Sequence, residues 1–321
     1  MITVIYHSAD FDGIFCREIA RHFLGDKDVQ YIGWNFGDPE IVIPPEGPIY
    51  IMDLPVDKPF GMNLSPSDWP TYSCWIDRVI WIDHHASSIA SHPENILGYR
   101  IDGVAACRLA WRWVSAVRRV SEQMPGGLTW AMDHYPWPTK QDFLDRKVSE
   151  PLAVRLAGEY DVWDRKWMAE DSEILTFQYG LKCYKVLPFD ELLDKGRDPG
   201  DPGRESVLRV LQAGMLAQEY AENMDRFWLA EAGHIIEWEG LRFLAKNTVE
   251  RGSNMFLSRD VSETGHDALL AYGYRGKLWT VSLYHAKHRT NLDLSAIAVK
   301  YGGGGHKGAC GFTCKTLPFS L

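Results

Sequence analysis

The chain has 321 residues, enough for two domains with a sizeable hydrophobic core, and its composition is ordinary for a globular protein apart from 13 tryptophans. Its formal net charge of −9 argues against a protein that tracks long nucleic acid, because such a protein needs many Lys and Arg contacts to phosphate. No stretch reaches the roughly 18 apolar residues that span a bilayer, no secretory signal is recognisable, and the six cysteines lack CxxC spacing, so we expect a cytoplasmic protein with free thiols and no membrane partner.

The first 120 residues alternate short apolar runs with helix-like segments. The expected strands, apolar on both faces, are 2–6, 29–34, 48–53 and 78–83. The expected helices are 13–25, which ends at Gly25, and 104–120. This alternation predicts an α/β fold with a mostly parallel sheet and helices on both faces.

The pattern changes in the second half of the chain. Residues 150–184 are typical of helices, and a long helical pattern runs from about 205 to 231. From 233 onward come short strands and one helix, 292–301, before a glycine-rich segment. We therefore expect an N-terminal domain over 1–200, a linker helix over 201–232 and a smaller α+β domain over 233–321.

Charge is distributed unevenly between these parts. Residues 241–321 hold 11 Lys or Arg and 5 Asp or Glu, whereas residues 1–240 hold 23 basic and 38 acidic residues. The acidic balance of residues 1–240 favours metal binding there, and the basic balance of residues 241–321 favours phosphate binding.

Potential metal ligands follow three of the predicted strands directly. They are His7, Asp10 and Asp12 after the first strand, Asp53 after the third, and Asp83, His84 and His85 after the fourth. Any one of them alone is more commonly a turn or helix-cap residue. Because the carboxyl ends of parallel strands meet at one edge of a sheet, their coincidence predicts a binding site there.

Carboxylates with a few imidazoles suit Mn²⁺ or a similar divalent ion, whereas thiolates would favour zinc. Five or more ligands are enough for two ions that share a carboxylate, an arrangement that suits in-line attack at phosphorus. The segment "GEYDVWD" offers Asp161 and Asp164 to complete the second ion's site, and we favour Asp161 because Tyr160 and Trp163 imply a partly buried position. The residues by themselves predict hydrolysis of a phosphate ester or anhydride.

The C-terminal segment "YGGGGHKGACGF" indicates a different kind of site. Consecutive glycines let the backbone approach a ligand closely, and their N–H groups can form an anion-binding nest. Lys307 could add charge to this nest, and upstream Arg289 is the best candidate for a bidentate phosphate contact, although a solvated charged face explains that region equally well. The predicted substrate-binding residues of this part are Arg289, Gly303, Gly304, Gly305 and His306.

The motifs "HSADFDG", "IMD", "DHH", "YD" and "GGGGHKGACG" together resemble the DHH phosphoesterase superfamily with its DHH-associated C-terminal domain. The resemblance runs from residue 7 to 311. It implies two α/β domains flanking a cleft that holds the active site, a two-Mn²⁺ centre in the first domain, and substrate-binding groups in the second. Mg²⁺ or Co²⁺ would be substitutes for Mn²⁺. Known members include RecJ exonuclease, nano-RNases, cyclic-dinucleotide phosphodiesterases and pyrophosphatases.

The resemblance also implies residue roles. One ion would be held by His7, Asp10 and Asp53, and the second by Asp12, Asp53, His84 and Asp161, so that Asp53 bridges. His85 would contact the scissile phosphate, which makes Asp53, His84 and His85 the catalytic set. Asp83 would orient His84 or a nearby group, and His306 with the glycines would bind the far end of the substrate.

Size and charge favour the nano-RNase-like branch, an Mn²⁺-dependent phosphodiesterase that cleaves short RNA or DNA oligonucleotides or dinucleotides to mononucleotides. Tyr160 or Trp163 could stack on a base. The alternatives are a phosphatase or phosphodiesterase for a small nucleotide, such as a cyclic nucleotide or a nucleoside bisphosphate, and a nucleotide sensor without activity. The aromatic segments "CWIDRVIWID" and "HYPWPTKQDF" match no family motif, and they either reshape the cleft or cover a homodimer surface.

Overall fold

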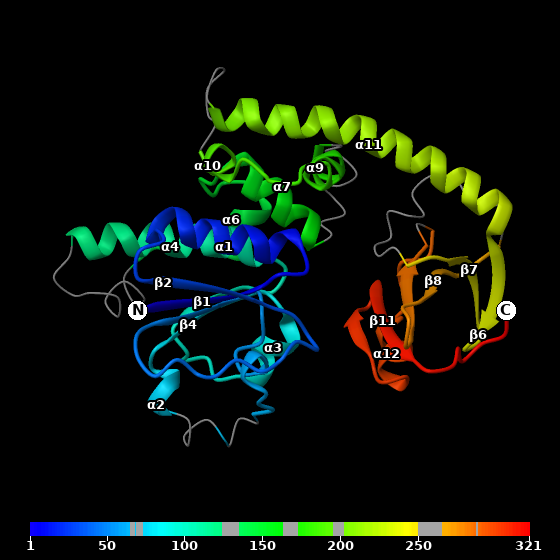
Figure 1. Cartoon of the computed structure of the whole chain (residues 1–321), viewed down its shortest axis with the longest axis horizontal. Helices are drawn as coiled ribbons and strands as arrows, with labels where there is room; N and C mark the ends of the chain where they lie inside the picture. Colours follow the sequence, from blue (N-terminus) through cyan, green and yellow to red (C-terminus); the bar gives the residue numbers. More distant parts are fainter. Residues whose placement is uncertain are drawn as a thin grey trace. The chain divides into compact units, whose positions relative to one another are not determined.

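The computed structural model describes residues 1–64, 68, 73–123, 135–162, 173–194, 202–249, 265–286 and 288–321. They form two compact units, Met1–Met215 and Leu216–Leu321 (Figure 1). Two expectations from the sequence stay predictions. One is the division of the chain into three parts, and the other is the cleft that would hold the active site. Trp163 and Asp164 lie outside the described residues. Within the described ranges, no helix has both the length and the apolar character that crossing a membrane requires.

The first unit is built on a five-stranded parallel sheet with the strand order β2-β1-β3-β4-β5. Its strands are β1 (Ile2–His7), β2 (Val29–Trp34), β3 (Ile49–Met52), β4 (Val79–Asp83) and β5 (Gly98–Arg100). The predicted parallel α/β fold is confirmed. The three-residue β5 was not predicted, because so short a run carries no recognisable period.

One prediction about these strands is wrong. Strand β2 was expected to be buried on both faces, but only Trp34 of its six residues is buried. The reason is its position at the edge of the sheet, where only β1 flanks it. Strands β3 and β4, in contrast, are buried at every residue.

Helices cover both faces of this sheet. One face packs on α1 (Phe11–Leu24) and α4 (Ala106–Gln123), the other on α2 (Ser73–Ile76) and α3 (Ala86–Ser91) (Figure 1). Side chains of β4 alternate between the two cores, as the strand period requires: Ile82 joins the α1/α4 core and Trp81 the opposite one. The remaining helices of this unit are η1 (Lys58–Phe60), α6 (Lys140–Leu144), α7 (Leu152–Asp161), α9 (Glu173–Lys182), α10 (Phe189–Leu192) and the start of α11 (Pro202–Ala232).

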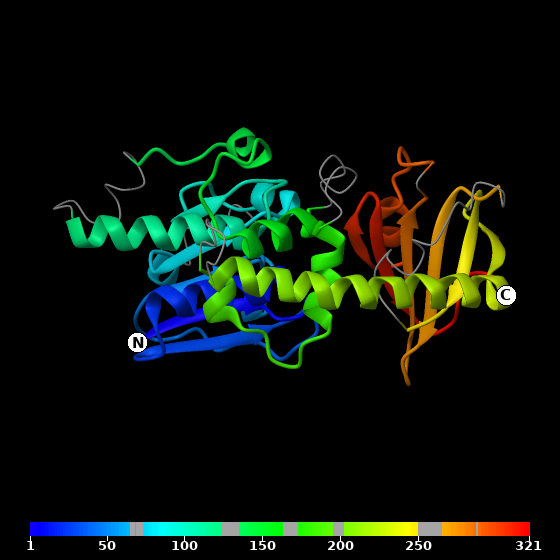
Figure 2. The same cartoon turned by 90° about the horizontal axis from the view of Figure 1, so that it is seen from above.

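The second unit is a mixed six-stranded sheet with the order β10-β11-β9-β8-β7-β6. Its elements are β6 (His234–Trp238), β7 (Leu241–Asn247), β8 (Ala268–Tyr274), β9 (Trp279–His285), α12 (Ser295–Lys300), β10 (Gly304–His306) and β11 (Ala309–Cys314). The predicted α+β class is confirmed. Helix α11 is one uninterrupted helix of 31 residues (Figure 2), and its Asp225 forms a buried ion pair of 3.1 Å with Lys246 of β7.

Two buried ion-pair groups fix the position of α7 in the first unit. The guanidinium of Arg108, on α4, contacts Glu150 just before α7, with Nε 2.9 Å from Oε1. Both side chains are almost fully buried, at 3% and 2% exposure. Within α7, Glu159 accepts from Arg146 at 2.8 Å and 2.6 Å and from Arg155 at 3.2 Å. These contacts hold the helix whose last residue is Asp161.

Glu150→Ala should destabilise the first unit by about 3–5 kcal/mol, because it leaves the Arg108 guanidinium buried without its counter-ion. Urea unfolding followed by circular dichroism measures this change. Lys147→Ala, which removes one side of an exposed pair with Asp145, is the matched control and should leave the midpoint unchanged. Equal midpoints for both variants would contradict this role of the Arg108–Glu150 pair.

Candidate metal centre

Three sets of potential ligand atoms lie at the carboxyl edge of the parallel sheet. Within each set, all the atoms lie within 4.8 Å of one another. The sets are His7, Asp10 and Asp53; Asp12, His84 and Asp161; and Asp53, His84 and His85. They include all six residues predicted as metal ligands. Residues far apart in the sequence meet here because parallel strands end at the same edge.

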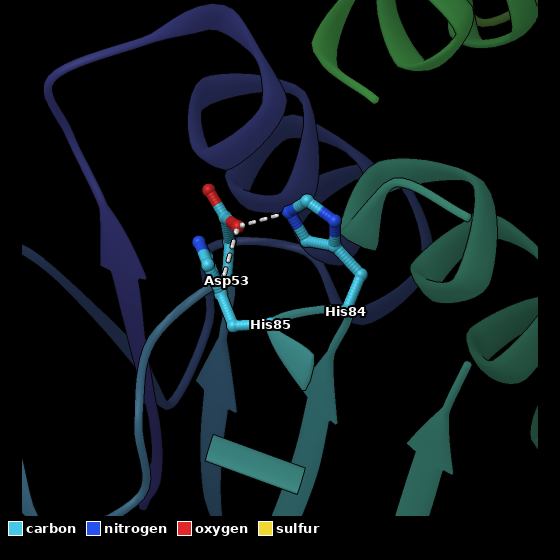
Figure 3. A group of neighbouring side chains, drawn as sticks. All are labelled: Asp53, His84 and His85. Atoms are coloured by element: carbon cyan, nitrogen blue, oxygen red, sulfur yellow. Dashed lines mark ion pairs between the residues drawn. The ribbon is translucent and has the colours of Figure 1, made fainter. Parts of the chain in front are cut away.

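Asp53 lies between the sets, and its two carboxylate oxygens face different histidines. Its Oδ2 is 3.3 Å from Nδ1 of His7, whereas its Oδ1 is 3.3 Å from Nε2 of His84 and 3.9 Å from Nδ1 of His85. Figure 3 shows the His84 and His85 rings, which follow β4, on either side of the Asp53 carboxylate, which follows β3. Asp53 therefore belongs to two of the three sets and directs one oxygen toward each of them.

The Asp53 backbone is held in an unusual conformation. Its φ is +59°, in the left-handed region that non-glycine residues seldom adopt, and its N–H donates to the carbonyl of Ile82 at 2.9 Å. Such conformations persist where the surroundings impose them, and they cluster at functional sites. Here the conformation places a 2%-exposed carboxylate at the strand edge.

Asp10 combines the two roles that the sequence left as alternatives. It is the N-cap of α1, with Oδ1 accepting from the N–H of Gly13 at 3.1 Å, and its Oδ2 lies 2.9 Å from Nδ1 of His7. Glycine at position 13 lets the start of α1 lie close to the backbone of His7, because a Cβ there would lie 1.8 Å from the carbonyl oxygen of His7. Capping and ligand placement are therefore compatible in one side chain.

Asp12 is anchored by a second helix. Its two oxygens accept from the N–H groups of Ala106 and Cys107, at 2.9 Å and 2.8 Å, in the first turn of α4. Its Oδ2 also lies 3.7 Å from Nε2 of His84. The sequence did not predict these amide contacts. The available signal was that the segment "GVAAC" opens a helix without a capping side chain, so its free N–H groups need an acceptor from elsewhere.

Asp83 contacts His85 and not the ring of His84. Its Oδ1 lies 2.7 Å from Nδ1 of His85 and accepts from the backbone N–H of His84 at 2.8 Å. Asp83 is fully buried, whereas the His85 side chain is 35% exposed. The carboxylate thus orients a partly exposed imidazole.

The pKa values show how strongly these groups interact. Burial lowers the pKa of His7, but the carboxylates of Asp10 and Asp53 outweigh it and raise that pKa to about 10. Burial, followed by the charge of Asp53, raises the pKa of Asp12 to about 7. For Asp53, the neighbouring imidazoles of His7 and His84 together outweigh burial and lower the pKa. The carboxylates repel one another strongly and are held together by histidine charge.

The residues present fit divalent cations. Among the described residues, Oδ1 of Asp53 is buried without an aligned hydrogen-bond donor, so a lone pair is available in the centre of the cluster. Burial, followed by the charge of Asp12, raises the pKa of the nearby thiols of Cys16 and Cys107 well above the usual range, so neither supplies a thiolate. Oxygen and imidazole donors without thiolates favour Mn²⁺ or Mg²⁺ over structural zinc.

The remaining predicted residues belong to the second unit. Arg289 forms an ion pair with Asp267, with which a phosphate would have to compete. The expected amide nest does not include Gly303, because its N–H donates to the carbonyl of Ala298 at 2.8 Å. A Cβ at Gly303 would lie 2.1 Å from the carbonyl oxygen of Gly311, so close packing against β11 requires glycine at this position. Gly304, Gly305 and His306 form the edge strand β10, exposed at each residue.

Neither a family model nor a curated protein matches the sequence. Solved structures do. The pGpG-specific phosphodiesterase PggH from Vibrio cholerae has 14% identity and a TM-score of 0.42, covering 98% of this chain and 93% of its own. An exopolyphosphatase-related protein from Bacteroides fragilis has 12% identity and a TM-score of 0.48, covering 100% and 87%. RecJ with Mn²⁺ from Thermus thermophilus has 15% identity and a TM-score of 0.44, covering 97% of this chain and 49% of its own. Because these TM-scores lie below 0.5, we infer the function from the side chains of this chain.

Asp53→Asn should lower the number of bound Mn²⁺ ions from two to none or one weakly held ion, because the amide removes the charge of a side chain whose two oxygens face different ligand sets. Asp10→Asn should remove only the ion beside His7. Isothermal titration calorimetry with elemental analysis of the dialysed protein measures both stoichiometries. Two tightly bound ions in Asp53→Asn would contradict the bridging role, and circular dichroism would check that the fold is intact.

Metal binding should release protons, and Mn²⁺ affinity should rise from pH 6 to pH 8. Without metal, the raised pKa values of His7 and Asp12 mean that protons occupy ligand atoms near neutral pH, and an ion must displace them. Raising the pH from 6 to 8 weakens this competition, most of all at Asp12. Calorimetry in two buffers of different ionisation enthalpy counts the released protons, and an affinity independent of pH would contradict the expectation.

Proposed function

We propose that this chain is a metal-dependent phosphoesterase of the DHH superfamily, and that it hydrolyses short oligonucleotides or dinucleotides to mononucleotides with two Mn²⁺ ions. Its motifs from residue 7 to 311 support the superfamily, and its ligand cluster supports the chemistry. His7, Asp10 and Asp53 would hold one ion, and Asp12, Asp53, His84 and Asp161 the other.

The observation that carries the proposal is the position of Asp53. One buried carboxylate faces His7 with one oxygen and His84 with the other, so two ligand sets share it. Two divalent ions held in this way would lower the pKa of a water molecule and offset the charge on phosphoryl oxygens. A chain with only a structural site would have no need for a second, partly exposed ligand set.

His85 supplies the chain's own contribution to phosphate binding. Its burial opposes the imidazolium, but the hydrogen bond and charge of Asp83 outweigh burial and raise the pKa of His85. The raised pKa favours the cationic form of the ring, which Asp83 fixes in direction and which is partly exposed. A cationic donor held in place before the reaction stabilises charge that develops on a phosphoryl oxygen.

The proposed length of the substrate follows from charge. An overall charge of −9 does not suit a long basic groove, whereas the basic residues of the last 81 positions suit one or a few phosphates. Arg289, Gly304, Gly305 and His306 stay proposed contacts for the far end of the substrate, whereas the N–H of Gly303 is already bonded to Ala298.

A substrate panel with Mn²⁺ tests the proposal: RNA and DNA of two to twenty nucleotides, cyclic dinucleotides, a nucleoside 3′,5′-bisphosphate and pyrophosphate. We expect kcat/KM to be highest for the shortest linear oligonucleotides. His85→Ala should lower kcat by about 10²- to 10³-fold while two ions stay bound. His22→Ala, an exposed histidine about three turns along α1, is the matched control and should retain full activity.

The outcomes separate the alternatives. Preference for the bisphosphate or a cyclic dinucleotide would favour the small-nucleotide phosphatase. Binding of dinucleotides without any release of mononucleotide would favour the sensor. Unchanged turnover in His85→Ala would contradict the phosphate contact assigned to that imidazole.

A further inference from the structure

Phe36 is an exposed aromatic side chain just beyond the carboxyl end of β2, with 66% of its surface open. Strand β2 ends at Trp34, the register partner of His7 on β1, so these two side chains leave the sheet on the same face. The Phe36 ring packs on Trp34 with 5.4 Å between centroids. Phe36 therefore packs on the side chain that shares a face with His7, two positions beyond the residue paired with His7.

The turn that carries Phe36 is fixed by hydrogen bonds. The Asn35 N–H donates to Oδ2 of Asp38 at 2.8 Å, and the Asp38 N–H donates to the carbonyl of Asn35 at 2.9 Å. Oδ1 of Asn35 accepts from the N–H of Ser8 at 3.2 Å, which ties the turn to the residue that follows His7. Such a turn can present a ring to a ligand with little loss of backbone freedom on binding.

We propose that Phe36 is a stacking platform for a nucleobase of the substrate, adjacent to the phosphate that is cleaved. This inference rests on the proposed function and adds a base-binding subsite to it. A stacking face tolerates every base, because each base has a π-face, and purines should gain most from their larger overlap. Tyr160, a stacking candidate from the sequence, packs instead against the helical core.

The test compares a dinucleotide with an analogue that lacks the base beside the scissile phosphate. Phe36→Ala should lower kcat/KM on the dinucleotide by about 5- to 150-fold, mainly through KM, and change it less than twofold on the abasic analogue. Phe36→Trp should restore the rate on the dinucleotide, whereas Phe36→Leu should not. Val42→Ala, an 88%-exposed side chain in the same connection, is the matched control and should leave both rates unchanged.

The outcomes distinguish this inference from the proposed function. Equal losses on both substrates, or no loss on either, would overturn the subsite and leave the phosphodiesterase intact. Failure of the wild-type protein to hydrolyse either substrate with Mn²⁺ would overturn the proposed activity, and the subsite with it. Metal stoichiometry and thermal unfolding should be the same in all the Phe36 variants.

Discussion

The whole candidate site depends on mutual charge compensation around Asp53. The three overlapping sets contain four carboxylates and three imidazoles. Carboxylates alone would repel one another, and buried charges of one sign would lose their hydration without compensation. Asp53 resolves this by facing a histidine with each oxygen. The left-handed backbone of Asp53 is the unfavourable part of that position. The hydrogen bond from its N–H to the carbonyl of Ile82 and the buried strands β3 and β4 hold the residue in place.

Local structure and ligand placement use the same atoms in this protein. Asp10 caps α1 with one oxygen and faces His7 with the other. Asp12 accepts the first amides of α4 and faces His84. Helix starts favour carboxylates for electrostatic reasons that have nothing to do with metals. The same carboxylates therefore lie at the carboxyl edge of the sheet and accept hydrogen bonds from the first N–H groups of the helices.

The sequence predicted most of the first sheet because its strands are continuous apolar runs bounded by polar residues. It also predicted which ionisable side chains meet beside the sheet, since parallel strands end at one edge. It misjudged β2, because an apolar run does not reveal that a strand lies at the edge of its sheet. It could not find the Arg108–Glu150 contact or the partner of Asp83, because both depend on packing between segments. Nor could it single out Phe36, because its proposed role depends on packing against Trp34, the register partner of His7.

Asp12 has a consequence for comparing this chain with relatives that have lost activity. A lineage that abandoned the metal would still need an acceptor for the first amides of α4, so selection for folding alone would retain Asp12. Among the residues that the structure describes, no helix amide donates to Asp161, the last residue of α7. Divergence at Asp161 would therefore record the loss of chemistry sooner than divergence at Asp12, and an intact "DFDG" motif by itself would be a poor marker of an active enzyme.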